Sequence, residues 1–375
     1  KITLLVFKKR MSTSQGVHVI AGGLGSLGRA LQKKLLEHGK QVRVLDLAPS
    51  SAASSKLVHP TSIGYVQCDL STSTRSETLE NALRDAETVH SVVTPHVLNS
   101  TFKDMKQTNV DGVQHLLDAC RKVGVPKLVH ASTMAVTNQS LPHNEHDETT
   151  PLPPWDTYGI PYDKTKRQGE ELVMNAATNQ NDNSNFQACA LRLGSILAGP
   201  GDYNMQHFSD YPGRCFAIGS EKIDVISVHD IATAFAKASE KLDATQSNVN
   251  GKAIFVTKCK SSRKLSSPTQ MEITQAYADH FGWDVVKVPQ WLVSSVAIGY
   301  RNLQNVKNLV STPTEEKMSS FPIDLALDSM GQPFTFDNSR AHQLLDFEPE
   351  ETWQDAVART AEEFKDKHPE LFIKK

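Results

Sequence analysis

A tyrosine and a lysine stand four residues apart, at Tyr162 and Lys166 in the segment YDKTK. In a helix this spacing places both side chains on one face. A lysine ammonium near a phenol favours the phenolate and lowers the pKa of the phenol, so Tyr162 could exchange a proton with an alcohol or a ketone. Such a pair also arises by chance in a chain with 7 tyrosines and many lysines. Its weight therefore depends on the elements around it.

Two hydroxyl residues, Ser132 and Thr133, end an apolar run that predicts a strand over 127–132. A hydroxyl at this point could donate a hydrogen bond to a substrate oxygen and hold it beside Tyr162. The alternative is that both hydroxyls only cap the end of the strand. The helix predicted over 158–177 follows this strand, so Thr133, Tyr162 and Lys166 are the candidate catalytic residues.

A glycine-rich turn over 22–28, GGLGSLG, lies between a short apolar run at 17–21 and a helical pattern of leucines. A strand, a glycine turn and a helix in this order form the first unit of a dinucleotide-binding fold. Gly22 would turn the chain sharply, Gly25 would let backbone N–H groups approach a pyrophosphate, and Gly28 would let the helix pack closely. The predicted cofactor-binding residues of this turn are Gly22, Gly25, Ser26, Leu27 and Gly28.

Acidic residues end the next two predicted strands. Asp46, at the end of 41–47, could accept both hydroxyls of the adenosine ribose and would repel a 2′-phosphate, so NAD is favoured over NADP. Asp69 could accept a hydrogen bond from the adenine amino group. The alternative is that Asp69 caps the helix that follows. The strand at 88–93 should end under the nicotinamide. The remaining predicted cofactor contacts are Leu70, Val92, Tyr162 and Lys166.

The alternation of strands and helices predicts an α/β fold with a doubly wound parallel sheet of the Rossmann type. We expect the cofactor domain to consist of 16–193 and 227–258. A smaller, discontinuous substrate lid would comprise 194–226 and 259–375, where the pattern becomes irregular. We expect residues 1–15 to be a disordered leader.

The bulk composition excludes several classes of protein. A net charge of −2 gives no electrostatic case for nucleic acid or an anionic membrane. The 5 cysteines are scattered and lack a CxxC pair, which indicates a reducing, intracellular compartment and argues against a zinc site or disulfide framework. No apolar run reaches the length of a membrane span.

Two segments leave alternatives open. The loop over 137–157 carries His143, Glu145 and His146, and we interpret it as a solvated flap rather than a metal site, because no rigid element fixes the ligand geometry. We interpret the segment 289–300, PQWLVSSVAIGY, as ordinary packing within the lid. Its alternatives are a lid helix over a flat lipid substrate and an anchor on a membrane surface.

Taken together, these motifs resemble the extended short-chain dehydrogenases, and within them the 3β-hydroxysteroid dehydrogenase and sterol-4α-carboxylate 3-dehydrogenase group. The resemblance implies a catalytic set of Thr133, Tyr162 and Lys166, with hydride transfer from a substrate carbinol carbon to NAD while Tyr162 removes the hydroxyl proton. Asn109 matches the start of the family's central helix block, and we expect it to anchor backbone. The stretches that carry the resemblance are the glycine turn, the Tyr162–Lys166 pair, 109–133, 191–202, 228–235, 250–257 and 344–364.

The resemblance also implies a sterol-like small-molecule substrate that is converted to a 3-ketone. If the substrate carries a 4α-carboxyl group, the product is a β-keto acid, which loses CO2 without a metal. We expect a location in the cytoplasm or at the surface of the endoplasmic reticulum. Dimers are common in this fold, but the sequence does not establish one.

Two other functions stay open. A nucleotide-sugar epimerase or dehydratase shares the cofactor turn and the tyrosine–lysine pair. Against it, the segment 203–225 offers few basic groups for a diphosphate, chiefly Arg214 and Lys222. The third candidate is an NAD(P)-sensing protein without turnover, and the intact catalytic set argues against it.

Overall fold

The computed structural model describes residues 16–72, 76–97, 99–179, 185–199, 205–243, 247–260, 265–310, 319 and 322–372. The leader expected over 1–15 lies outside these residues.

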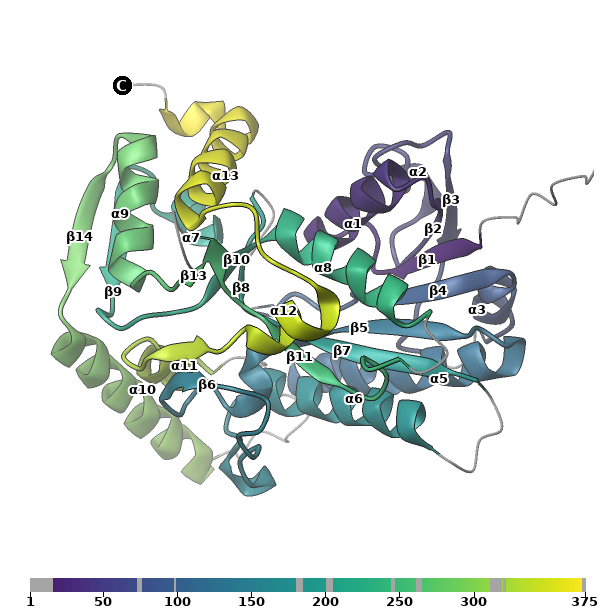
Figure 1. Ribbon diagram of the computed structural model, residues 1–375. Helices are drawn as coiled ribbons and strands as arrows, with labels where there is room; N and C mark the ends of the chain where they lie inside the picture. The colour runs from purple at the N-terminus through teal and green to yellow at the C-terminus, as the bar shows by residue number, and fades with distance from the viewer. Residues whose placement is uncertain are drawn as a thin grey trace, which may run out of the picture.

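A seven-stranded parallel sheet forms the centre of the molecule, in the order β11-β7-β5-β4-β1-β2-β3 (Figure 1). The order reverses at β1, so that the crevice between β1 and β4 is the position where ligands bind in sheets of this type. Most residues of the central strands are buried, as expected for strands covered on both faces. The strands are β1 (Val17–Ala21), β2 (Gln41–Asp46), β3 (Ile63–Gln67), β4 (Ala86–Ser91), β5 (Lys127–Thr133), β7 (Gln187–Leu193) and β11 (Ala253–Val256).

Helices cover both faces of this sheet, which confirms the predicted doubly wound α/β fold. One face carries α1 (Ser26–Glu37), α8 (Val228–Lys241) and α12 (Ser339–Leu345), and the other carries α3 (Ser76–Leu83), α5 (Gly112–Val123) and α6 (Pro161–Thr178). The short helices α2 (Ser50–Ala53) and α4 (Phe102–Lys106) belong to the connections.

Two local features place the site helices. Helix α6 begins with Pro161 at its first position, where the fixed backbone angle of proline suits a helix and its missing N–H is not needed. Helices α4 and α5 are joined by a π-helical turn, Gln107–Asp111, which carries the buried Asn109. Such turns often occur at functional sites.

The later chain forms small sheets and helices beside the carboxyl edge of the main sheet. An aromatic cluster of Phe208, Tyr277, Phe281 and Phe364 packs helices α9 and α13 together. The strands are β8 (Ser195–Leu197), β9 (Arg214–Ile218), β10 (Val225–Ser227), β12 (Cys259–Lys260), β13 (Leu265–Ser266) and β14 (Asp284–Val288). The helices are α7 (Gln206–Asp210), α9 (Gln270–Phe281), α10 (Gln290–Val310), α11 (Ile323–Ser329) and α13 (Trp353–Lys367), with 3-10 turns at Met134–Thr137, Trp155–Thr157 and Pro369–Phe372.

The loop between β5 and α6 contains a strand that pairs with the distant C-terminal part of the chain. Strand β6 (His143–His146) runs parallel to β15 (Phe334–Phe336). The His143 ring is buried against the Phe334 and Phe336 rings, at centroid distances of 5.2 and 5.3 Å. The interpretation of the loop over 137–157 as a solvated flap is therefore wrong for β6, because a partner strand almost 200 residues later fixes it, whereas Asn144 and Glu145 are exposed.

Helix α10 buries one side and exposes an apolar side. Val293 and Ala297 are buried, and Arg301 pairs with Asp324 of α11 at 3.1 Å. The expectation of ordinary packing is wrong for the outer side, whose exposed residues are Trp291, Leu292, Val296, Ile298, Tyr300 and Leu303. Among the described residues, no helix combines the length and apolar character needed to cross a bilayer.

Candidate active site

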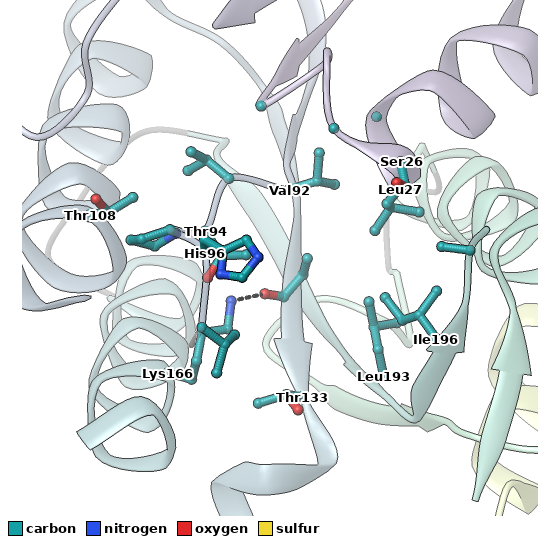
Figure 2. Close-up of a pocket in the computed structure, with 18 of the residues that line it drawn as sticks. Ser26, Leu27, Val92, Thr94, His96, Thr108, Thr133, Lys166, Leu193 and Ile196 are labelled. Carbon is teal, nitrogen blue, oxygen red and sulfur yellow. Dashed lines mark hydrogen bonds between the residues drawn. The ribbon is translucent and has the colours of Figure 1, made fainter. Parts of the chain in front are cut away.

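A cleft of about 650 Å³ opens at the carboxyl ends of the central strands, between the glycine turn and helix α6 (Figure 2). Its far wall includes Ile223 and Phe334 from the later chain. The fold thus brings all of the predicted site residues to one cavity. They are Gly22, Gly25, Ser26, Leu27, Gly28, Asp46, Asp69, Leu70, Val92, Thr133, Tyr162 and Lys166.

The glycine turn has the geometry that a close-approaching phosphate group requires. Gly22 has φ +86°, and a Cβ there would lie 2.8 Å from the backbone of Val93. A Cβ on Gly28 would lie 2.5 Å from the Gly22 carbonyl oxygen, so only glycine lets α1 start this close to the turn. A Cβ on Gly25 would meet only one atom within 4 Å, and no side chain caps the start of α1. An open, uncapped helix N-terminus beside the cleft fits a dinucleotide pyrophosphate.

Asp46 is held in place by the glycine turn and by the residues that follow it. Its carboxylate accepts the Leu24 N–H at 3.0 Å and the Ala48 N–H at 3.3 Å. Arg43 lies on the opposite side of β2 and pairs with Asp85 at 2.9 Å, so it does not neutralise Asp46. This arrangement fits a ribose with free hydroxyls.

The other acidic candidate, Asp69, forms a local turn. Its Oδ1 accepts from the backbone N–H and the hydroxyl of Ser71, at 2.9 and 2.7 Å. Helix α3 begins only at Ser76, so Asp69 is not its cap. Lys56, which the sequence analysis did not single out, also lines this end of the cleft.

The two hydroxyl residues at the end of β5 have different partners. The Thr133 hydroxyl accepts the Ala135 N–H at 3.2 Å, and the same side chain acts on the Tyr162 phenol, whose pKa it lowers. Ser132 instead points into the core and donates to Glu170 at 2.5 Å. Thr133 therefore both caps the strand end and faces the phenol, whereas the Ser132 hydroxyl is occupied elsewhere.

Lys166 contacts strand β5 directly. Its Nζ donates to the Ala131 carbonyl oxygen at 2.5 Å (Figure 2). Burial lowers the pKa of Lys166 to about 8, and the nearby Glu170 carboxylate opposes this shift. At neutral pH the ammonium is therefore charged, but it lies close to the pH at which it loses its proton.

The pKa of Tyr162 differs from the sequence-based expectation. Burial, aided by the Asp163 carboxylate, raises it to about 12, and the hydrogen bond with Thr133 only partly opposes this. The expectation that Lys166 lowers the pKa of this phenol is wrong for this structure, because the lysine is directed to a backbone carbonyl and desolvation dominates. The phenol holds its proton at neutral pH.

Two buried polar residues, Asn109 and Glu170, lie behind the site. The sequence analysis expected Asn109 to anchor backbone and did not identify Glu170. Asn109 donates to Thr165 of α6 at 3.2 Å and accepts from Thr94 at 3.4 Å, so the π-helical turn joins α6 to the loop after β4. Glu170 was missed, although it continues the four-residue spacing beyond Lys166. A signal was available in Arg192, a charged residue within the buried strand β7, which needs a buried partner.

The cleft wall beside Thr133 is apolar. Leu193 lies opposite Thr133 in the β5–β7 register, and its neighbours in the wall include Met134, Ile196 and Phe334. The residues that line the cleft do not include Arg214 or Lys222.

A family model described as the 3-beta hydroxysteroid dehydrogenase/isomerase family matches residues 19–273. The 3beta-hydroxysteroid-dehydrogenase/decarboxylase isoform 1 of Arabidopsis thaliana is 26% identical over 373 residues, covering 92% of this chain and 79% of the relative. The decarboxylating sterol-4-alpha-carboxylate 3-dehydrogenase of Saccharomyces cerevisiae is 27% identical, covering 64% and 70%. The 3 beta-hydroxysteroid dehydrogenase type 7 of Mus musculus is 25% identical, covering 92% and 94%.

Solved structures share the fold at lower identity. A UDP-glucuronic acid 4-epimerase from Bacillus cereus, in complex with UDP-glucuronic acid and NAD, superposes with a TM-score of 0.66 at 19% identity, covering 93% of this chain and 99% of the epimerase. A short-chain dehydrogenase/reductase superfamily protein from Agrobacterium tumefaciens with bound NAD gives a TM-score of 0.64 at 18% identity, covering 94% and 98%. These likenesses concern the fold alone.

Proposed function

The chain belongs to the 3-beta hydroxysteroid dehydrogenase/isomerase family, and on this premise we propose that it is an NAD-dependent dehydrogenase that oxidises the 3β-hydroxyl group of a steroid or sterol to a ketone. One observation carries the substrate class. Thr133 and Tyr162 line a cleft whose adjoining wall is apolar, which suits a flat hydrocarbon better than a sugar diphosphate.

The protein's own residues would hold the alcohol and move its proton. NAD, when bound, supplies a nicotinamide ring that accepts a hydride. Thr133 donates a hydrogen bond to the substrate oxygen, and the Tyr162 Oη takes the hydroxyl proton during oxidation. Because the pKa of Tyr162 is about 12, the rate of oxidation should rise with pH where the phenolate fraction limits it.

We assign the cofactor to the end of the cleft formed by the glycine turn. The N–H groups around Gly25, Ser26 and Leu27 would bind the pyrophosphate, and Asp46 would accept the ribose hydroxyls. In this proposal the cofactor domain consists of 16–193 and 227–258, and the remaining residues after 193 form the substrate lid, except for helix α12, which packs on the main sheet.

A finer proposal concerns a 4α-carboxyl group on the sterol. Two of the relatives are named for a decarboxylase or decarboxylating activity, and the yeast relative is named for a sterol-4-alpha-carboxylate substrate. Oxidation at C3 would give a β-keto acid, whose carboxyl group leaves as CO2 while the electron pair of the broken C–C bond passes into an enol. This step needs no group beyond the ketone that the dehydrogenase forms.

The experiment is a substrate panel with purified protein and NAD. The panel contains a 3β-hydroxysteroid, a 4α-carboxysterol and UDP-glucuronic acid, with absorbance of NADH and release of CO2 as readouts. NADH with the steroid and sterol supports the dehydrogenase, and added CO2 with the 4α-carboxysterol supports the finer proposal. Conversion of UDP-glucuronic acid without net NADH would replace the proposal with an epimerase, and the absence of any conversion would refute both enzyme proposals.

A further inference from the structure

Helix α6 meets the end of strand β5 through three side chains that lie one helical turn apart. The three contacts pair Tyr162 with Thr133, Lys166 with the Ala131 carbonyl, and Glu170 with Ser132. Three consecutive residues of the strand are thus each held by one turn of the helix. The first two contacts belong to the proposed catalytic set, and the third lies behind it in the core.

Glu170 is itself held by a buried ion pair across the sheet. Arg192 of β7 donates to the carboxylate through Nη2 at 2.6 Å and through Nε at 3.0 and 3.2 Å. The two side chains are only 4% and 7% exposed. Ser132 lies directly opposite Arg192 in the strand register and supplies a further hydrogen bond to the same carboxylate. A buried pair with this many partners holds one geometry, because any movement leaves a charge unpaired.

We propose that Glu170 is a positioning residue of this dehydrogenase: it holds α6 against β5 so that Tyr162 faces Thr133, and its negative charge, one helical turn from Lys166, keeps that lysine protonated. The proposal rests on the proposed function for the roles of Tyr162 and Lys166. It also explains why only one of the two adjacent hydroxyls serves the substrate, since the Ser132 hydroxyl is bound to Glu170.

The charges around Lys166 support this assignment. Burial lowers its pKa, and the Glu170 carboxylate opposes the shift. On β5, burial and the charge of Lys166 lower the pKa of His130 well below its usual value, so His130 is neutral. Tyr162 of α6 keeps its proton at neutral pH. His96, another titratable residue of the cleft lining, is exposed on the loop after β4.

The test measures the pKa of Lys166 directly in the cofactor-free protein, by NMR of lysine labelled with 13C at Cε, with the resonance assigned from a Lys166→Met variant. In Glu170→Gln we expect this pKa to fall by about one unit, because an opposite charge at this range shifts a pKa by about 1–3 units and part of the field is offset by Arg192. Glu171→Gln is the matched control. Glu171 is the next residue on the helix, is 44% exposed and pairs with Arg167, so its loss should leave Lys166 unchanged.

Two further variants separate positioning from folding. Glu170→Gln leaves Arg192 buried without its partner, so the double variant Glu170→Gln/Arg192→Met removes both charges. It should fold, and the pKa of Lys166 should still fall, but by less than in Glu170→Gln, because the positive charge of Arg192 is removed together with the carboxylate. Ser132→Ala removes only the hydrogen bond and should leave the pKa unchanged while lowering kcat about tenfold with an unchanged KM for NAD.

The outcomes distinguish this proposal from the proposed function. An unchanged pKa of Lys166 in both Glu170 variants that fold by circular dichroism, or a kcat of Ser132→Ala equal to that of the wild type, overturns the role of Glu170. A shifted pKa without any NADH formation by the wild type would leave the electrostatic role in place and refute the dehydrogenase.

Discussion

Replacing Asp163 with asparagine should make the protein more stable above neutral pH. The side chain is 1% exposed and accepts two hydrogen bonds from Gln139, from the backbone N–H at 3.0 Å and from Nε2 at 2.6 Å. These bonds do not offset its loss of hydration, and burial raises the pKa of Asp163 from 3.8 to about 7. An asparagine keeps the shape and stays neutral, and the Gln139 amide can turn its oxygen toward the new Nδ2.

The magnitude follows from the difference between the folded and unfolded pKa values. Because the folded pKa is higher, the folded protein binds the Asp163 proton more tightly than the unfolded chain does. The contribution of Asp163 to stability is therefore greatest at low pH and falls as the pH rises from about 4 to about 7. At about 1.4 kcal/mol per unit, the wild type loses up to about 4 kcal/mol across this window. Asp163→Asn should not show this loss, and the gap between the two proteins should stay constant above pH 7.

The assay is unfolding in urea, followed by tryptophan fluorescence between pH 5 and 8 at constant ionic strength. The difference in free energy of unfolding between Asp163→Asn and wild type should grow with pH and then level off. Comparing the two proteins cancels the contributions of Asp224 and Asp230, whose pKa values burial raises to about 6. Asp156→Asn, an exposed change of the same chemistry, should produce no such growth. A difference that does not vary with pH would refute the reasoning.

Three other predictions test the cleft. Tyr162→Phe should lower turnover by about 100-fold or more yet retain NAD binding by calorimetry; unchanged turnover would remove the phenol from the mechanism. Asp46→Ser should raise the ratio of kcat/KM for NADP to kcat/KM for NAD, because a 2′-phosphate then meets no carboxylate. The control Asp85→Asn should leave this ratio unchanged. An unchanged ratio in Asp46→Ser would place the ribose elsewhere. Gly28→Ala should abolish NAD binding, because its Cβ would lie 2.5 Å from the turn backbone. Gly124, with a φ of +79°, has free space around it, so Gly124→Ala should cost only about 1 kcal/mol of stability. Equal effects of the two variants on NAD binding would contradict the close-packed turn.

Local spacing was sufficient to predict the glycine turn and the gathering of the candidate site residues in one cleft. The order of strand, glycine turn and helix, with Asp46 at the next strand end, constrains the backbone over short distances, and parallel strands bring their carboxyl ends to one edge. The position of Tyr162 and Lys166 in one cleft follows from the same rule, because both lie on the helix after β5.

What spacing could not predict depends on contacts between distant segments. The target of Lys166 is a carbonyl of β5, and no side-chain pattern marks a carbonyl. The β6–β15 pairing joins residues that are remote in sequence, so His143 looked like part of a polar loop. The exposed side of α10 is apolar, and a sequence pattern alone does not distinguish an apolar residue that is covered from one that is not.

The pairing of β15 has a consequence for where the catalytic unit ends. The family match stops at residue 273, yet Phe334 forms part of the cleft, and Phe336 stacks on Phe255 of the central sheet at 4.4 Å. The Phe336 N–H also donates to the buried Asp224 carboxylate at 2.9 Å. A protein shortened to the matched region would expose the edge of β6, deprive Asp224 of a donor and open the substrate wall to water. The shared family segment and the last hundred residues are therefore inseparable parts of one enzyme.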